Sequence, residues 1–223
     1  MPVNAFLVEH PAGLCLVDAG QSVAASVPGY LPRWHPFLRI ARFELEAGDE
    51  VAAQLAGLGF RPEQVRWVVL THLHTDHIGG LGPFASAEVI VSEVEWRRAS
   101  GLRGAIRGYV PKQWPATVEP RLVQLAGPPL GPFRASLDLV GDGTLRLVPL
   151  PRHTPGQIGV LVGEDGAGAL VGGDVAHDRA ELDALEPELA AYLDEHGLAL
   201  LLSHDDDAPA LLDLRAGLAV SRS

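Results

Sequence analysis

One polar segment, residues 71–77, constrains this chain more than any other feature. It reads Thr-His-Leu-His-Thr-Asp-His and directly follows an apolar stretch. Imidazoles and carboxylates are costly to bury unless they are paired or bind a metal, and both are common ligands of Zn²⁺ and similar ions. In extended backbone His72 and His74 point to the same side, and a turn at Asp76 and His77 can direct two further ligands at a neighbouring ion. A polar capping loop is the alternative, which the preceding strand disfavours.

The composition is that of a folded protein of moderate size. The chain has 223 residues, of which 47% are hydrophobic and 20% are charged, so it can bury a sizeable core. No linker or shift in composition divides it, and we expect one domain over residues 1–223. The net charge of −11 argues against a nucleic-acid partner, because such proteins usually carry a basic surface that neutralises phosphates.

Three features bear on the compartment. Cys15 is the single cysteine, so no disulfide can form within the chain, and a reducing compartment is allowed. The N-terminal segment has no basic residues before its apolar stretch and does not have the pattern of a signal peptide. The longest apolar run, Leu198–Leu202, is far shorter than the ~20 residues that span a bilayer. We expect a cytoplasmic protein without membrane contact, and the oligomeric state stays open, a homodimer included.

The first half predicts strands followed by helices. Strands are expected at 5–8, 14–17, 65–70 and 88–91, and residues 21–47, which lack a clear period, are expected to form a long loop.

A helix is expected over 49–58, capped by Asp49 and ended by Gly59, with one apolar face made by Val51, Leu55 and Leu58. Ser92 and Glu95 have the spacing of a capping box, in which each side chain binds the other residue's backbone N–H at the start of a helix.

The second half predicts strands at 145–150 and 198–202, a hairpin of 157–162 with 169–171, a helix over 180–196 that is broken at Pro187, and a last helix over 209–217. Residues 101–132 are rich in glycine and proline and stay unassigned. Because each half has strands first and a helix after, we predict a four-layer αββα sandwich of the α+β class, with the candidate site at one edge of its two sheets.

The motif His-x-His-x-Asp-His after a strand resembles the signature of the metallo-β-lactamase superfamily. Four further segments follow the family's order along nearly the whole chain. They are Asp18-Ala19-Gly20, His153-Thr154-Pro155-Gly156, Gly172-Gly173-Asp174 and Leu202-Ser203-His204-Asp205. Any one of these four alone is a weak signal, whereas five elements in the correct order are a strong one.

The resemblance implies a site for two divalent metal ions, most typically Zn²⁺, with Mn, Fe or Co as alternatives. It assigns His72, His74 and His153 to the first ion and Asp76, His77 and His204 to the second, with Asp174 and a hydroxide bridging them. It implies hydrolysis by attack of that hydroxide, with Asp76 also relaying a proton. Asp18 is a candidate for orienting a ligand imidazole, with capping of a strand end as the alternative.

Several branches of the family fit poorly. The zinc β-lactamases use a cysteine ligand in the second half, whereas the only cysteine here is Cys15. The flavodiiron branch has a glutamate where this chain has His74. Glyoxalase II enzymes add a helical domain, and we expect none after His204. The nucleases of the family bring extra domains, and the acidic charge does not suit them.

The chain is most similar to the N-acyl homoserine lactonase group, through its Ser-His-Asp ending and the segment Tyr109–Trp114. This similarity implies a small lactone or ester as substrate, whose ring is opened by attack on the ester carbonyl. The aromatic residues Trp34, Phe37 and Trp114 are candidate walls of an apolar slot for an acyl chain, with ordinary core packing as the alternative.

Three departures put the substrate, more than the metals, in question. His177 stands where the group has a substrate-contacting tyrosine, so it is a candidate catalytic residue. Arg152 replaces the glycine before His153, and we expect an edge strand before the first strand pair to be absent. A phosphotriesterase or another ester hydrolase on the same fold stays open, as does a non-catalytic metal-binding or interaction protein.

Overall fold

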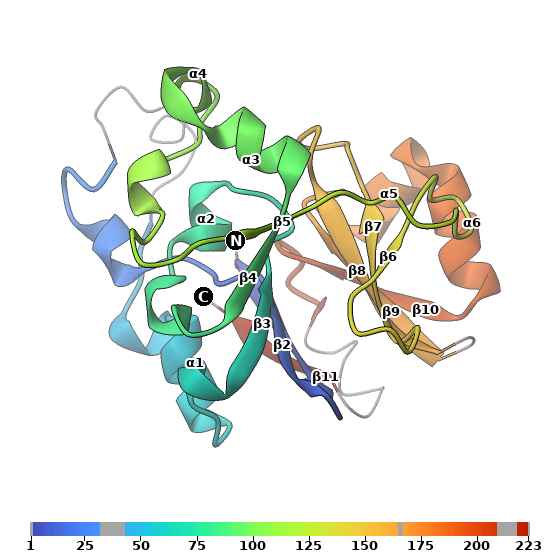
Figure 1. Ribbon diagram of the computed structural model, residues 1–223, viewed down its shortest axis with the longest axis horizontal. Helices are drawn as coiled ribbons and strands as arrows, with labels where there is room; N and C mark the ends of the chain where they lie inside the picture. Colours follow the sequence, from blue (N-terminus) through green and yellow to red (C-terminus); the bar gives the residue numbers. More distant parts are fainter. Residues whose placement is uncertain (1, 32–42, 165–166, 209–217, 223) are drawn as a thin grey trace.

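Two β-sheets lie between two layers of helices in the computed structural model, which describes residues 2–31, 43–164, 167–208 and 218–222 (Figure 1). The first sheet has the strand order β11-β1-β2-β3-β4-β5. Its strands are β1 (Asn4–His10), β2 (Gly13–Val17), β3 (Val65–Val69), β4 (Glu88–Ser92), β5 (Arg121–Val123) and β11 (Leu218–Arg222). Strands β2 to β5 run parallel, and β1 is antiparallel to both of its neighbours.

The second sheet has the order β10-β9-β8-β7-β6. Its strands are β6 (Leu137–Asp138), β7 (Leu145–Pro149), β8 (Ile158–Glu164), β9 (Ala167–Gly173) and β10 (Leu198–Leu202). Strand β10 is parallel to β9, and the other pairs are antiparallel. Strands β7, β9 and β10 therefore point in the same direction, and their carboxyl ends meet at one edge of this sheet.

Helices cover the outer face of each sheet (Figure 1). The first sheet carries α1 (Val51–Gly57), α2 (Thr75–Ile78), α3 (Glu93–Ala99) and α4 (Gly101–Ile106), and the second carries α5 (Arg179–Leu185) and α6 (Pro187–Glu195). Short 3₁₀ turns lie at Val23–Ser26, Ala47–Asp49, Pro62–Gln64, Gly82–Phe84 and Pro111–Gln113.

Alternation along the strands builds a core on each side of each sheet. In β1, Phe6 and Val8 enter the cluster between the two sheets, whereas Ala5 and Leu7 enter the cluster beneath α1. Successive side chains of a strand face opposite sides, so apolar residues at all four positions require a strand that is covered on both faces. The structure thus has the four αββα layers that the sequence predicts.

The predicted strand pairs, the hairpin and the helix interrupted at Pro187 are all present, while other local details differ. The helix at 51–57 buries Val51 and Leu55, but Leu58 is 49% exposed because the helix ends before it, and Glu50 rather than Asp49 is its N-cap. The predicted capping box is wrong, because Ser92 makes no side-chain capping bond. The predicted helix over 209–217 lies outside the described residues.

The outer edge of β1 pairs with β11, a strand that the sequence analysis did not anticipate. Pairing satisfies backbone groups that an edge strand otherwise leaves open. Among the described residues, no helix combines the length and the apolar character that crossing a bilayer requires.

Candidate metal centre

The candidate ligands all lie just beyond the carboxyl ends of strands. His72 and His74 follow β3, and Asp76 and His77 lie in the short helix α2 directly after them. In the second sheet His153 follows β7, Asp174 follows β9 and His204 follows β10. The strand directions bring these segments to one edge of the sandwich, so residues far apart in the sequence converge there.

A glycine allows the turn that aims Asp174 into the site. Gly173 has a φ of +58°, and a Cβ at this position would lie 2.8 Å from the Thr71 hydroxyl oxygen. A residue with a side chain is disfavoured there both by its backbone conformation and by this close approach. The turn lets the carboxylate of Asp174 point toward the loop that follows β3.

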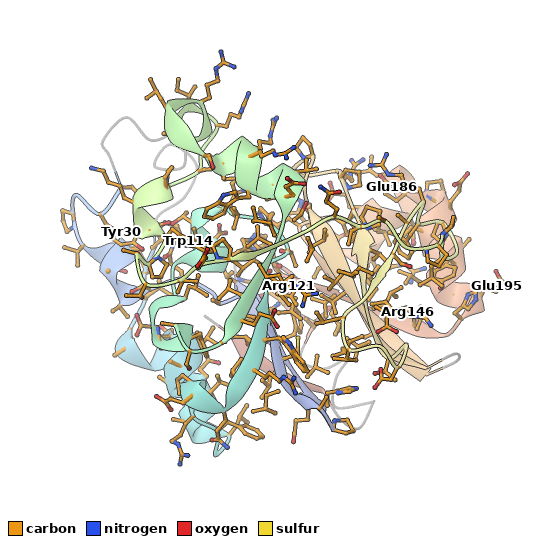
Figure 2. All side chains as sticks on the ribbon, in the orientation of Figure 1. Tyr30, Trp114, Arg121, Arg146, Glu186 and Glu195 are labelled. Atoms are coloured by element: carbon orange, nitrogen blue, oxygen red, sulfur yellow. The ribbon has the colours of Figure 1, made fainter. Side chains whose placement is uncertain are left out.

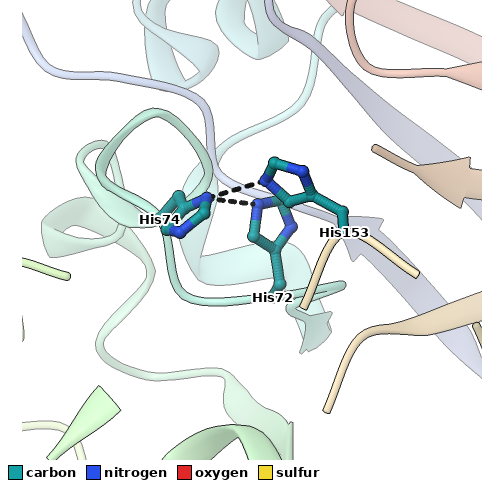
Figure 3. Close-up of side chains that lie close together, drawn as sticks. All are labelled: His72, His74 and His153. Carbon is teal, nitrogen blue, oxygen red and sulfur yellow. Dashed lines mark hydrogen bonds between the residues drawn. The ribbon is translucent and has the colours of Figure 1, made fainter. Parts of the chain in front are cut away.

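His72, His74 and His153 form the first cluster (Figure 3). Nδ1 of His74 lies 3.2 Å from Nε2 of His72 and 2.9 Å from Nε2 of His153. Four ligand atoms at the ~2.0–2.1 Å typical of Zn–N bonds are separated from each other by about 3.3 Å in a tetrahedron. The distances from His74 Nδ1 to the other two nitrogens are therefore already close to the spacing that one zinc ion requires.

Asp76, His77 and His204 form the second cluster. Oδ2 of Asp76 lies 3.9 Å from Nε2 of His77 and 3.6 Å from Nε2 of His204. His77 is completely buried, and the side chain of His204 is largely so. Two imidazoles and one carboxylate offer ligand atoms suited to a divalent ion.

Asp174 lies between the two clusters. Its Oδ2 is 3.7 Å from Nε2 of His72, 3.6 Å from Nε2 of His153 and 3.3 Å from Nε2 of His204. Its Oδ1 is 3.4 Å from Nε2 of His77. One carboxylate therefore lies near nitrogens of both clusters, so the geometry fits the expected position of a bridging ligand.

Several polar atoms of the site have no hydrogen-bond partner. Asp76 Oδ1, His77 Nε2 and Asp174 Oδ1 are buried, and within the described part of the chain none of them makes a hydrogen bond. The 3.4 Å between the last two atoms is within ion-pair range, but it lacks the angles of a hydrogen bond. A buried polar atom left unpaired costs about 1–3 kcal/mol. Metal ions in the two clusters would satisfy His77 Nε2 and Asp174 Oδ1, so the residues present fit two divalent ions.

Burial and neighbouring charges shift the histidines in opposite directions. Burial and the nearby His77 hold the pKa of His72 well below its usual value, and burial also lowers the pKa of His153. Both imidazoles are therefore neutral near pH 7, and a metal binds the neutral form.

Burial acts in the same direction on His77 and His204, but carboxylates outweigh it. Asp174, Asp18 and Asp76 raise the pKa of His77 well above its usual value, and Asp174 raises the pKa of His204. Although burial raises the pKa of Asp174, the neighbouring imidazoles hold it well below the usual range. A metal ion that binds His77 or His204 would therefore compete with a proton for the imidazole nitrogen.

Contacts behind the ligands fix two of the imidazole rings. Asp18 accepts hydrogen bonds from the backbone N–H and the hydroxyl of Thr71, each at 2.8 Å. Its Oδ2 also lies 2.8 Å from Nδ1 of His77, as the proposed orienting role requires. His204 Nδ1 lies 2.8 Å from the Pro2 carbonyl oxygen. Both contacts leave the Nε2 atoms facing the site.

Two buried groups near the site were not anticipated from the sequence. The Thr75 hydroxyl, between His74 and Asp76, accepts hydrogen bonds from Nε2 of Gln21 at 2.9 Å and from Nε2 of Gln113 at 2.6 Å. Glu95, assigned to a capping box, instead lies fully buried behind the first cluster. The hydrogen bonds of Gln21 and Gln113 could not be predicted from a local sequence pattern, because Thr75 is 38 or more residues away from each of them.

His177, the candidate catalytic residue, lies at the rim of the site. Its side chain is 69% exposed, its ring stacks against that of His204 with centroids 6.3 Å apart, and its Nδ1 lies 2.8 Å from Glu181 Oε2. Arg152, before His153, pairs at 3.4 Å with Glu186, which lies beside α5 and α6 (Figure 2).

Of the three aromatic residues that are candidate walls of an acyl-chain slot, the structure describes Trp114. Trp34 and Phe37 lie outside the described residues. Trp114, which Figure 2 labels, packs edge-on against Trp96 with centroids 4.8 Å apart, and its indole N–H donates to the Val118 carbonyl. These contacts tie Trp114 to the core beside α3, in agreement with the packing alternative.

The structure is thus an αββα sandwich that gathers histidine and aspartate side chains at one edge of its two sheets. Residues 1–216 match the metallo-β-lactamase superfamily. The chain therefore belongs to the metallo-β-lactamase superfamily, and its fold is the metallo-β-lactamase fold.

Two relatives of this chain are named as a metallo-hydrolase and as a lactonase. The chain is similar to a protein of Mycobacterium bovis named as a probable metallo-hydrolase, with 36% identity over 81% of this chain and 58% of that protein. It thus spans somewhat more than half the length of that relative. It is also similar to the N-acyl homoserine lactonase AttM of Agrobacterium fabrum, with 30% identity over 93% of this chain and 83% of AttM.

Solved structures support the fold assignment. A variant of AiiA from Bacillus thuringiensis, solved with N-decanoyl-L-homoserine at its active site, superposes with a TM-score of 0.68. It is 19% identical, and the match covers 91% of this chain and 81% of that one. At this identity the likeness concerns the fold alone.

Proposed function

We propose that the protein is a metal-dependent hydrolase that opens a lactone or a related ester. The observation that carries this proposal is the set of two ligand clusters that share Asp174 at the edge of the sandwich. A polar cluster with only a structural role would satisfy its own buried atoms. In this cluster three buried atoms have no hydrogen-bond partner within the described part of the chain.

We assign the ligands as the family motif implies. His72, His74 and His153 would hold one ion, Asp76, His77 and His204 the other, and Asp174 would contact both. Two bound ions would lower the pKa of a water molecule to about 7 and polarise an ester carbonyl. We favour Zn²⁺, because five imidazoles and two carboxylates suit it, although Mn, Fe and Co accept the same donors.

The chain's own residues would then orient the substrate and move protons. Asp76 Oδ1 is buried without a hydrogen-bond partner among the described residues, and we assign to it the transfer of a proton to the leaving alkoxide. The side chain of His153 is 37% exposed and those of His72 and His77 are buried, so substrate would enter past His153. His177, at the rim, is our candidate donor to the carbonyl oxygen.

A lactone is the preferred substrate class because AttM, a relative over 93% of the chain, is named an N-acyl homoserine lactonase. In opening a lactone, the ester C–O bond breaks and one water is added, so the products are a carboxylate and an alcohol on one molecule. The alcohol stays attached to the product, so no second molecule has to leave past the buried side chains of His72 and His77.

The test combines metal analysis with a substrate panel. Metal content of the purified protein would be measured by elemental analysis, and hydrolysis would be followed for N-acyl homoserine lactones, aryl esters and phosphotriesters. The proposal predicts two bound ions per chain and the highest kcat/KM for lactones, with activity lost on chelation and restored by Zn²⁺. A protein that binds no metal would overturn the hydrolase proposal. A preference for phosphotriesters would overturn only the lactone assignment.

A further inference from the structure

Glu95 is a buried carboxylate whose position is explained neither by helix capping nor by an ion pair. It lies in the first turn of α3 and has no exposed surface. Its Oε1 accepts hydrogen bonds from the backbone N–H of Leu73 at 3.2 Å and the hydroxyl of Tyr109 at 2.8 Å, and its Oε2 accepts one from the hydroxyl of Thr154 at 2.8 Å. A carboxyl group at such depth is costly to bury unless its oxygens are hydrogen-bonded.

All three donors adjoin members of the first cluster, two along the sequence and one by ring packing. Leu73 lies between His72 and His74, and Thr154 directly follows His153. The ring of Tyr109 packs against that of His74, with centroids 5.0 Å apart. A single carboxylate therefore binds the segment carrying two of the histidines, the loop carrying the third, and the aromatic ring that backs one of them.

The loop after His153 is built to pack directly on this part of α3. A Cβ at Gly156 would lie 2.2 Å from the backbone nitrogen of Glu95 and 2.5 Å from its Cα. Only glycine allows such an approach. The contact is independent of the hydrogen bonds and fixes the same two segments, α3 and the loop at 153–156, relative to one another.

We infer that Glu95 is a positioning residue that joins the loops of His72, His74 and His153 into one three-nitrogen metal site. The inference rests on the proposed function, because it concerns the metal that this site would hold. Hydrogen bonds around metal ligands fix ring orientation, and their loss typically lowers metal affinity 10–100-fold. His153 comes from the other sheet, so its placement depends on contacts across the sandwich edge such as this one.

The experiment compares Glu95→Ala with Glu95→Gln. Alanine removes all three hydrogen bonds. Glutamine can keep both bonds at its amide oxygen, and its amide N–H can donate to the Thr154 hydroxyl, which can rotate to accept. We expect alanine to weaken metal binding at this three-nitrogen site 10–100-fold in competition with a chelator, and glutamine to restore most of that affinity. Glu93→Ala, on the same helix but bonded to Arg97 and Gln124, is the matched control and should stay within threefold.

If Glu95 served only to stabilise the fold, Glu95→Ala would lower the melting temperature equally with and without metal. If Glu95 positions the ligands, Glu95→Ala instead reduces the rise in melting temperature that metal produces. With Co²⁺ as the probe, Glu95→Ala should also alter the visible absorption of the bound ion. If Glu95→Ala does not fold, the variant with both Tyr109→Phe and Thr154→Val removes two of the three donors and should lower affinity at least tenfold.

The outcomes separate the two proposals. Wild-type protein that binds metal, with an affinity and cobalt spectrum unchanged in the Glu95 or the double variant, would overturn the positioning role and leave the hydrolase proposal intact. Wild-type protein that binds no metal would overturn both.

Discussion

Nδ1 of His77 lies 2.8 Å from Oδ2 of Asp18, and both side chains are buried. Asp18 has a φ of +61°, and among the residues that the structure describes it is the only non-glycine residue with a positive φ. Its backbone thus adopts a sparsely populated conformation that brings its carboxylate beneath the loop after β3. This contact leaves Nε2 of His77 facing Asp76 and Asp174, so it selects which nitrogen of the ring can bind a metal.

Asp18→Asn should lower metal affinity by about 10–100-fold with little loss of folding, because asparagine also tolerates a positive φ but cannot accept from Thr71 and His77 with both of its terminal atoms. The measurement is a chelator competition. Asp183→Asn, an exposed carboxylate paired with Arg179, controls for the lost charge. An affinity within threefold of wild type would mean that Asp18 only caps the strand end.

Metal binding should release protons near neutral pH. Asp174, Asp18 and Asp76 outweigh burial and raise the pKa of His77, so its proton must leave before the ring can bind a metal. A raised His pKa stabilises the metal-free protein fully below the unfolded value of about 6.5, and this contribution is lost as the pH rises through the folded pKa.

The rise in melting temperature produced by metal should therefore be larger at pH 8 than at pH 6. Calorimetric titration in two buffers of different ionisation enthalpy would count the protons directly. Equal heats in both buffers would contradict the expected release.

The thiol of Cys15 should be unreactive in the folded protein. It lies in the core between the sheets, and burial raises its pKa to about 12. Because the thiolate is the reactive form, labelling by a thiol reagent at pH 8 should occur only through unfolding. Its rate should thus rise steeply in denaturant. Stoichiometric labelling of the native protein within minutes would show that this core opens readily.

His177→Ala should lower kcat by about 10²–10³ on the preferred substrate if the ring donates to the developing oxyanion, with metal content unchanged. Its Nδ1 lies 2.8 Å from the carboxylate oxygen Oε2 of Glu181. With Nδ1 donating to that carboxylate, Nε2 can donate to the oxyanion only from the doubly protonated ring. His196→Ala, at the end of α6, is the control histidine. A fall of less than threefold would place His177 among surface residues.

The sequence was sufficient to predict the layers and the strand ends that meet at the candidate site. The alternation in β1 and the apolar runs of β3 and β10 are local patterns, and a strand end is where polar side chains can leave a sheet. His72, His153 and His204 were each predicted at such an end, and the structure brings them together around Asp174.

Long-range contacts could not be predicted in the same way. Ser92 and Glu95 have the spacing of a capping box, but the partners of Glu95 are Leu73, Tyr109 and Thr154, up to 59 residues away. Burial of the carboxylate outweighed the local capping preference. Strand β11 was missed for a similar reason, since its partner β1 lies at the opposite end of the chain.

The central claim is that Asp174 joins two metal sites, and Asp174→Ala tests it most directly. Elemental analysis and turnover would be measured on the same preparation. The control is Asp138→Ala, which removes a carboxylate at the end of β6 that accepts hydrogen bonds from the backbone of Gly141 and Gly143. The account predicts fewer than two bound ions per chain and a loss of activity for Asp174→Ala alone. Two tightly bound ions per chain with full turnover in that variant would contradict it.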